Sequence, residues 1–133
     1  MAKEKSAEKS ADQKLTAAEL RRQILAIDDR PLVPVKAWGL QLYVRPLTNR
    51  QRAELERAVV RNAGTKRQEI DTRGFNERVV VYGTCDENGN PIFTEEDIMA
   101  LSAKSAKEVS ALAETILEIS GMGRDSNESL KDN

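Results

Sequence analysis

Four short stretches that can cap the start of a helix recur along this chain, and they constrain its fold more than any other feature. Each begins with Thr or Ser and has Glu, Gln or Asp three residues later: TAAE at 16–19, TNRQ at 48–51, TEED at 94–97 and SAKE at 105–108. In such a capping box, the hydroxyl accepts a backbone N–H of the first turn, and the later side chain accepts the N–H of the cap residue. The sequence therefore predicts a helix after each box.

The first predicted helix has one apolar face. Leu20, Ile24 and Ile27 recur at the spacing that places side chains on one side of a helix. We expect the helix to stop near Asp28, because Pro31 disfavours helical geometry in the residue before it.

The last predicted helix has the broadest apolar face. Its members are Val109, Leu112, Ala113, Ile116 and Ile119. Gly121 should terminate this helix, with Met122 packing back on it as in a Schellman motif. The helix after TNRQ carries a thinner apolar stripe of Leu55, Ala58 and Val59.

A short hairpin is predicted between the first two helices. Residues 40–44 (LQLYV) alternate at the two-residue period of a half-buried strand. Val33 and Val35 indicate a shorter partner strand, which should lie at the sheet edge because Pro34 has no N–H to donate. Residues 37–39, Ala-Trp-Gly, would form the turn.

Two segments are less regular. The polar residues 62–74 are predicted to form a mobile loop, with Gly64 and Gly74 in it. Residues 75–84 contain three successive valines, which favour a strand, yet Phe75 and Tyr82 also fit one helical face. Helix and strand both remain open for this segment.

Together these patterns predict an α+β fold: a helix-rich small single domain with a short antiparallel β-hairpin and disordered termini. Residues 1–14 should be a disordered N-terminal arm, because they contain no large apolar residue after Met1. That arm could become helical on a partner. The single domain spans 15–122, and a flexible tail spans 123–133.

The composition argues against an enzyme. The chain has one cysteine, Cys85, and no histidine, which excludes an internal disulfide, a Cys/His zinc cluster and a Ser-His-Asp triad. It has no nucleotide-binding glycine motif. We therefore expect no catalytic residue, no cofactor and no metal, and we interpret Cys85 as a buried core residue.

The charge distribution also limits the partners. The net charge of −1 argues against nucleic-acid binding, which normally needs a basic surface. Residues 43–78 hold nine Arg/Lys against five Asp/Glu, and residues 86–133 hold four against eleven. This asymmetry could serve packing between the two halves or an assembly surface. No apolar run approaches the ~20 residues of a membrane helix, so no membrane contact is expected.

A calcium-binding module at residues 84–95 is a remote alternative. With Gly89 at position 6 of an EF-hand loop, the ligand positions that match are Asp86, Asn88 and Glu95. Thr84 stands where the first carboxylate belongs, and no second loop follows. The same residues also fit a turn followed by a capped helix, which is the interpretation we favour.

The order of these segments resembles a known family. LTAAELRRQILAIDDRP, a WG hairpin running into YVRPLT, then DENGNPIFTEED and LSAKSA are similar to the tail assembly chaperones of long-tailed, siphovirus-type bacteriophages or prophages. The resemblance covers residues 15–122. It implies a chaperone that binds the tape measure protein, keeps it soluble and recruits the major tail protein.

The resemblance further implies a protein of the host bacterial cytoplasm that is absent from the mature virion. In many such phages a translational frameshift yields a longer form, which would diverge in the tail from Gly123. The main alternative is a structural minor tail or head-to-tail joining protein that is retained in the virion. Self-association is also compatible with such a role.

The family provides no motif residue with a chemical role, so the candidate partner surface comes from the apolar residues themselves. The candidates are Trp38, Leu42, Val44, Ile116 and Ile119. An exposed Trp38 at the hairpin tip would be an interface anchor, because tryptophan is frequent among the residues that dominate interfaces. All five also fit a second interpretation, in which they form the core of the domain, and we favour that one.

Overall fold

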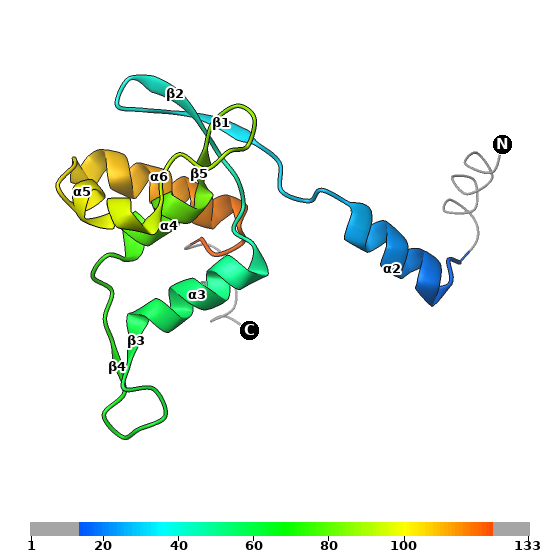
Figure 1. Cartoon of the computed structure of the whole chain (residues 1–133), viewed down its shortest axis with the longest axis horizontal. Helices are drawn as coiled ribbons and strands as arrows, with labels where there is room; N and C mark the ends of the chain where they lie inside the picture. Colours follow the sequence, from blue (N-terminus) through cyan, green and yellow to red (C-terminus); the bar gives the residue numbers. More distant parts are fainter. Residues whose placement is uncertain (1–13, 124–133) are drawn as a thin grey trace.

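The computed structural model of the protein describes residues 14–123. The predicted disordered arm and tail lie outside this range, apart from Lys14 and Gly123. Within it, the predicted α+β class is confirmed: helices dominate, and the strands form a small antiparallel sheet and a separate two-stranded ladder (Figure 1).

The elements follow in this order: α2 (Ala17–Ala26), β1 (Val33–Ala37), β2 (Leu40–Val44), α3 (Asn49–Val59), β3 (Val60–Arg61), β4 (Glu69–Ile70), α4 (Phe75–Gly83), β5 (Thr84–Cys85), the 3₁₀ helix η1 (Glu95–Asp97), α5 (Ile98–Ser102) and α6 (Ala106–Ile119). The first sheet has the order β1-β2-β5, and β3 pairs with β4 in a second ladder. Helix α2 lies apart from the other elements, which gather around α4 and α6 (Figure 1).

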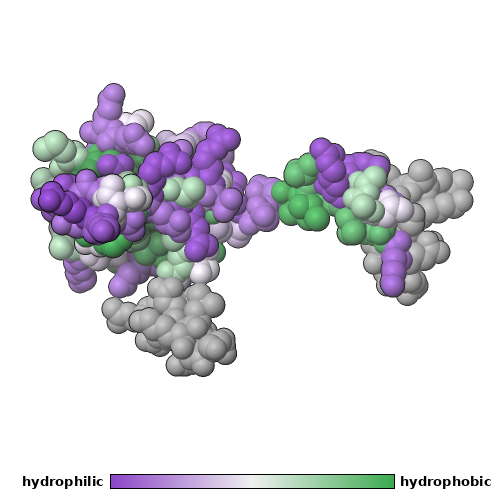
Figure 2. Space-filling model, turned by 90° about the horizontal axis from the view of Figure 1, so that it is seen from below, coloured by the Kyte–Doolittle hydropathy of each residue, from purple (hydrophilic) through white to green (hydrophobic). Residues whose placement is uncertain are grey.

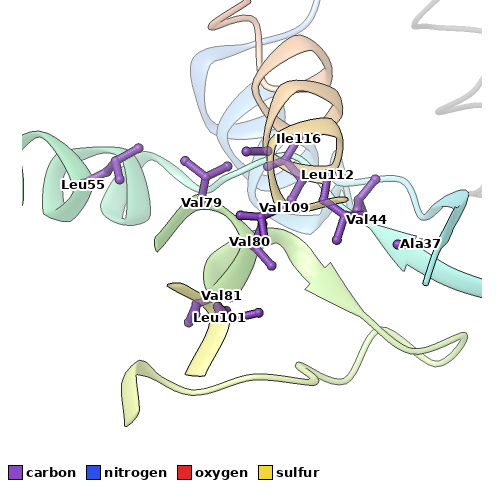
Figure 3. Close-up of a cluster of buried hydrophobic side chains, with 11 residues drawn as sticks. Ala37, Val44, Leu55, Val79, Val80, Val81, Leu101, Val109, Leu112 and Ile116 are labelled. Carbon is purple, nitrogen blue, oxygen red and sulfur yellow. The ribbon is translucent and has the colours of Figure 1, made fainter. Parts of the chain in front are cut away.

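The core lies where α4 and α6 pack on each other and on the first sheet. Figure 3 shows Val79 and Val80 of α4 facing Val109 and Ile116 of α6. Val79, Val80 and Ile116 have no exposed surface. Burial of each such side chain contributes about 1.5–3 kcal/mol, so this helix pair is the main source of cohesion in the fold.

The hairpin forms as predicted, with one change at its turn. Ala37 pairs with Leu40, so the turn contains only two residues. Trp38 has φ 53° and Gly39 has φ 73°, and positive φ at both central residues is what a type I′ turn requires. Strand β1 is at the sheet edge, which confirms the role expected of Pro34.

The segment left open between helix and strand contains both. Residues 75–83 form α4, and Thr84 and Cys85 then pair with β2. The three successive valines of α4 are all buried, because α6 and α5 cover more than one side of the helix. A helix that is enclosed in this way has no polar face to reveal its period.

The predicted loop at 62–74 is more ordered in its backbone than expected. Val60 and Arg61 pair with Ile70 and Glu69, and the Asp71 N–H donates to the Val59 carbonyl at 2.6 Å. The expectation of a segment without secondary structure is therefore wrong for 69–70. Strands of only two residues are too short to show the apolar alternation by which a strand is predicted.

Three of the four predicted capping boxes are present, at Thr16, Thr48 and Thr94. The fourth is wrong: Ser105 caps α6 without a side-chain hydrogen bond. Its expected partner Glu108 instead accepts the backbone N–H of Trp38 at 3.1 Å.

The end of α6 agrees with the prediction. The Met122 N–H donates to the Leu117 carbonyl at 2.8 Å, and the Gly121 N–H donates to the Glu118 carbonyl at 3.1 Å. Gly121 has φ 75°. These are the two hydrogen bonds and the left-handed residue of a Schellman motif.

Candidate partner-binding surface

Helix α2 carries apolar side chains that no other part of the described chain covers. None of its residues is buried, and it supplies no member of the core. Leu20 is 44% exposed and Ile24 63%. Leu25 and Ile27 are 69% and 60% exposed. Figure 2 shows hydrophobic residues on the part of the chain that contains α2, away from the packed body.

Local interactions are what start α2 at residue 17. The Glu19 N–H donates to Thr16 Oγ1 at 3.2 Å, and the Glu19 carboxylate accepts from the Thr16 N–H at 3.4 Å. An isolated helix of this length is marginal in water even with a good cap. Contact with a partner along the apolar face would therefore stabilise it.

The segment that follows α2 is held to the folded body by two arginines. Arg30 Nε donates to the Pro46 carbonyl at 2.7 Å, and Arg45 Nε donates to the Arg30 carbonyl at 3.2 Å. Arg45 also pairs with Asp28 at 3.4 Å. Partial burial, with the nearby Arg45 charge, lowers the pKa of Arg30. These bonds fix the point at which the chain leaves the body, just after α2.

The structure separates the five candidate residues into two groups. Val44 and Ile116 are 0% exposed, so the hypothesis that they contact a partner is wrong, and the core interpretation holds. Val44 lies on β2, against which α6 packs, and Ile116 lies on α6 where that helix packs against α4 (Figure 3).

Trp38, Leu42 and Ile119 are half-buried and pack against the same core. Trp38 lies in the hairpin turn, and its backbone is bonded to Glu108 of α6. These side chains keep some exposed surface, but each already has neighbours within the body. The five residues do not form one open apolar surface.

Within the segment 84–95, residues 86–90 form a turn held by its own hydrogen bonds. Asp86 Oδ1 accepts the N–H groups of Asn88 and Asn90, both at 2.9 Å. These bonds, that from Asn90 above all, lower the pKa of the Asp86 carboxyl. Thr84 is 1% exposed within β5. Among residues 14–123, no group of three or more Cys, Asp or Glu side chains is arranged to hold a metal ion.

Cys85 is 3% exposed and lies in β5. Burial raises the pKa of its thiol, an effect that the nearby Arg45 charge only partly opposes. A thiol that resists ionisation is a poor nucleophile. This environment supports the interpretation of Cys85 as a core residue.

Sequence reasoning found the apolar period of α2 but not that the rest of the described chain leaves its face uncovered. The pattern Leu20, Ile24, Ile27 is the same whether a helix packs on its own domain or on another molecule. Two features of the sequence could have indicated an exposed helix. The first turn contains little apolar surface, and Arg21 and Arg22 lie in the middle of the helix, so only a narrow apolar stripe is left to bury.

Within the described residues, no helix has the length and apolar character needed to cross a membrane. Comparison with family models, with curated proteins and with solved structures finds no match to this chain.

Proposed function

We propose that this protein is a tail assembly chaperone of a long-tailed bacteriophage or prophage. It binds the tape measure protein, keeps that chain soluble and recruits the major tail protein in the host cytoplasm. The observation that carries the proposal is the apolar face of α2, which no other part of residues 14–123 covers and which lies just before the anchor at Arg30 and Arg45.

An exposed amphipathic helix such as α2 suits a chaperone of a long helical chain. An amphipathic helix can pack on apolar residues of a partner, and many copies of one chaperone along a single partner gain avidity from weak contacts. The body then remains free to contact a second protein. The family resemblance of residues 15–122 supplies the identity of the two partners.

The test is co-expression with the tape measure protein encoded in the same gene cluster. We expect the two proteins to co-purify and the soluble fraction of the tape measure protein to rise. The control is co-expression with an unrelated small protein at a matched level. A tape measure protein that stays insoluble and unbound contradicts the proposal.

A second measurement separates the chaperone from a structural component of the virion. Quantitative mass spectrometry of purified particles should detect no stoichiometric amount of this chain. Stoichiometric presence would replace the proposal with a minor tail or head-to-tail joining protein.

A further inference from the structure

The apolar face of α2 has the spacing of a coiled-coil seam. Ala17, Leu20, Ile24 and Ile27 are separated by three, four and three residues, which is the alternation of a and d positions in a heptad. Ile27 is the C-terminal cap residue, so the seam runs the full length of the helix. A narrow seam of this kind fits a second helix better than a broad flat surface.

Two arginines distinguish the sides of this helix. Each residue advances about 100° around a helix axis, which places Arg21 at the edge of the seam and Arg22 on the opposite side. Within residues 14–123 neither guanidinium forms an ion pair. A helix that packs on the seam would bring its flanking side chains next to Arg21 and leave Arg22 in solvent.

We propose that α2 docks against an amphipathic helix of another protein that carries an acidic side chain opposite Arg21. This inference rests on the proposed function, in which the tape measure protein supplies that helix. The charge beside the seam favours this occupant over an antiparallel second copy of α2. Two copies packed antiparallel would place Arg21 beside its own equivalent, because Arg21 lies near the middle of the helix, and like charges in contact disfavour the pair.

The test uses two synthetic helical peptides and the full chain. Both peptides have about three heptads with Leu at the a and d positions, and they differ only in carrying Glu or Lys at the e and g positions. Affinities are measured by fluorescence anisotropy at low salt, at peptide concentrations where each peptide is monomeric. We expect the Glu peptide to bind about two- to fivefold more tightly than the Lys peptide.

Matched variants locate the interaction on α2. Arg21→Glu should reverse the preference between the two peptides, and Arg22→Glu should preserve it. Ile24→Ser should weaken binding at least about tenfold, whereas Leu25→Ser, at a residue that is 69% exposed but off the seam, should change it less than about twofold. Because α2 supplies no core residue, all four variants should keep a folded body.

Several results would overturn the inference. One is equal binding of the two peptides, and another is an equal effect of the two arginine variants. A third is self-association in sedimentation equilibrium that Ile24→Ser abolishes, because a second copy would then be the occupant. If the Ile24→Ser variant still captures the tape measure protein, the proposed function stands and this inference fails. If the peptide preferences hold but the tape measure protein is not captured, the inference stands and the proposed function fails.

Discussion

The backbone N–H of Trp38 donates to the carboxylate of Glu108 at 3.1 Å, across 70 residues of sequence. This bond ties the tip of the β1–β2 hairpin to the first turn of α6. Trp38 has φ 53°, a left-handed conformation that is uncommon for a bulky residue. The Glu108 carboxylate thus satisfies a donor that the turn presents to the helix.

The first prediction concerns this contact. Glu108→Ala should lower the free energy of unfolding by about 1–2 kcal/mol, because it leaves a partly buried N–H without an acceptor. Glu108→Gln keeps an acceptor and should lose less. Glu114→Ala, an exposed change on the same helix, is the control for lost charge. Urea denaturation measures all three, and equal losses at 108 and 114 would contradict the prediction.

A second prediction compares two capping boxes. Thr48 Oγ1 accepts the Gln51 N–H at 3.0 Å at the start of α3, a helix that buries Leu55. Thr48→Ala should therefore cost about 0.5–2 kcal/mol of global stability. Thr16→Ala should leave the global transition unchanged and reduce only the helicity of α2, because that helix buries no residue. Thermal unfolding followed by circular dichroism tests both, and a matching loss at Thr16 would show that α2 is coupled to the core.

A third prediction concerns the close approach of Gly83 to Ile116 in the core. A Cβ at Gly83 would lie 2.6 Å from Ile116 Cγ2, closer than carbon atoms can pack. Gly83→Ala should destabilise the protein by about 1–3 kcal/mol through overpacking. Combined with Ile116→Ala, it should cost less than the sum of the two single changes, because the second substitution removes the clashing atoms. Strict additivity in a double-mutant cycle would contradict the contact.

A fourth prediction concerns pH. The Arg73 side chain and backbone N–H bond the Asp71 carboxylate, and Arg61 pairs with it as well, which together hold the pKa of Asp71 well below its usual range. A depressed folded pKa means that the stabilisation is complete above the unfolded pKa of about 3.9 and is lost as pH falls toward the folded value.

Titration of the Asp71 carboxyl by NMR measures this directly. In the wild-type protein it should titrate below the usual range for aspartate, and Arg73→Gln should move its pKa upward. Arg67→Gln, on the same hairpin but outside the ion pair, should leave it in place. An ordinary pKa in the wild-type protein would show that the pairs at Asp71 do not persist in solution.

Much of the secondary structure follows from local sequence. Thr16, Thr48 and Thr94 start helices where expected, and Gly121 ends α6 with the predicted Schellman motif. The alternation in residues 40–44 defines a strand, and Pro34 marks its neighbour as an edge. These features depend on interactions between residues a few positions apart, so the sequence carries them directly.

Residues 75–85 show the limit of that reasoning. The helix Phe75–Gly83 and the strand Thr84–Cys85 follow each other within one apolar run, and the strand forms where Thr84 and Cys85 pair with Val44 and Tyr43, which lie about 40 residues earlier in the sequence. The Ser105 box failed for a related reason. The capping box would have Glu108 accept the nearby Ser105 N–H, but the hairpin turn places the Trp38 N–H within reach, and Glu108 accepts that donor instead.

The candidate surface was the least predictable part. Val44 and Ile116 have the same apolar character as Ile24, yet the first two are fully buried and Ile24 is 63% exposed. The sequence by itself determined where helices start and stop and which side chains share a face. Only the tertiary structure decided which apolar faces are buried within residues 14–123, because burial depends on contacts between residues far apart in sequence, and no other described element packs on the apolar face of α2.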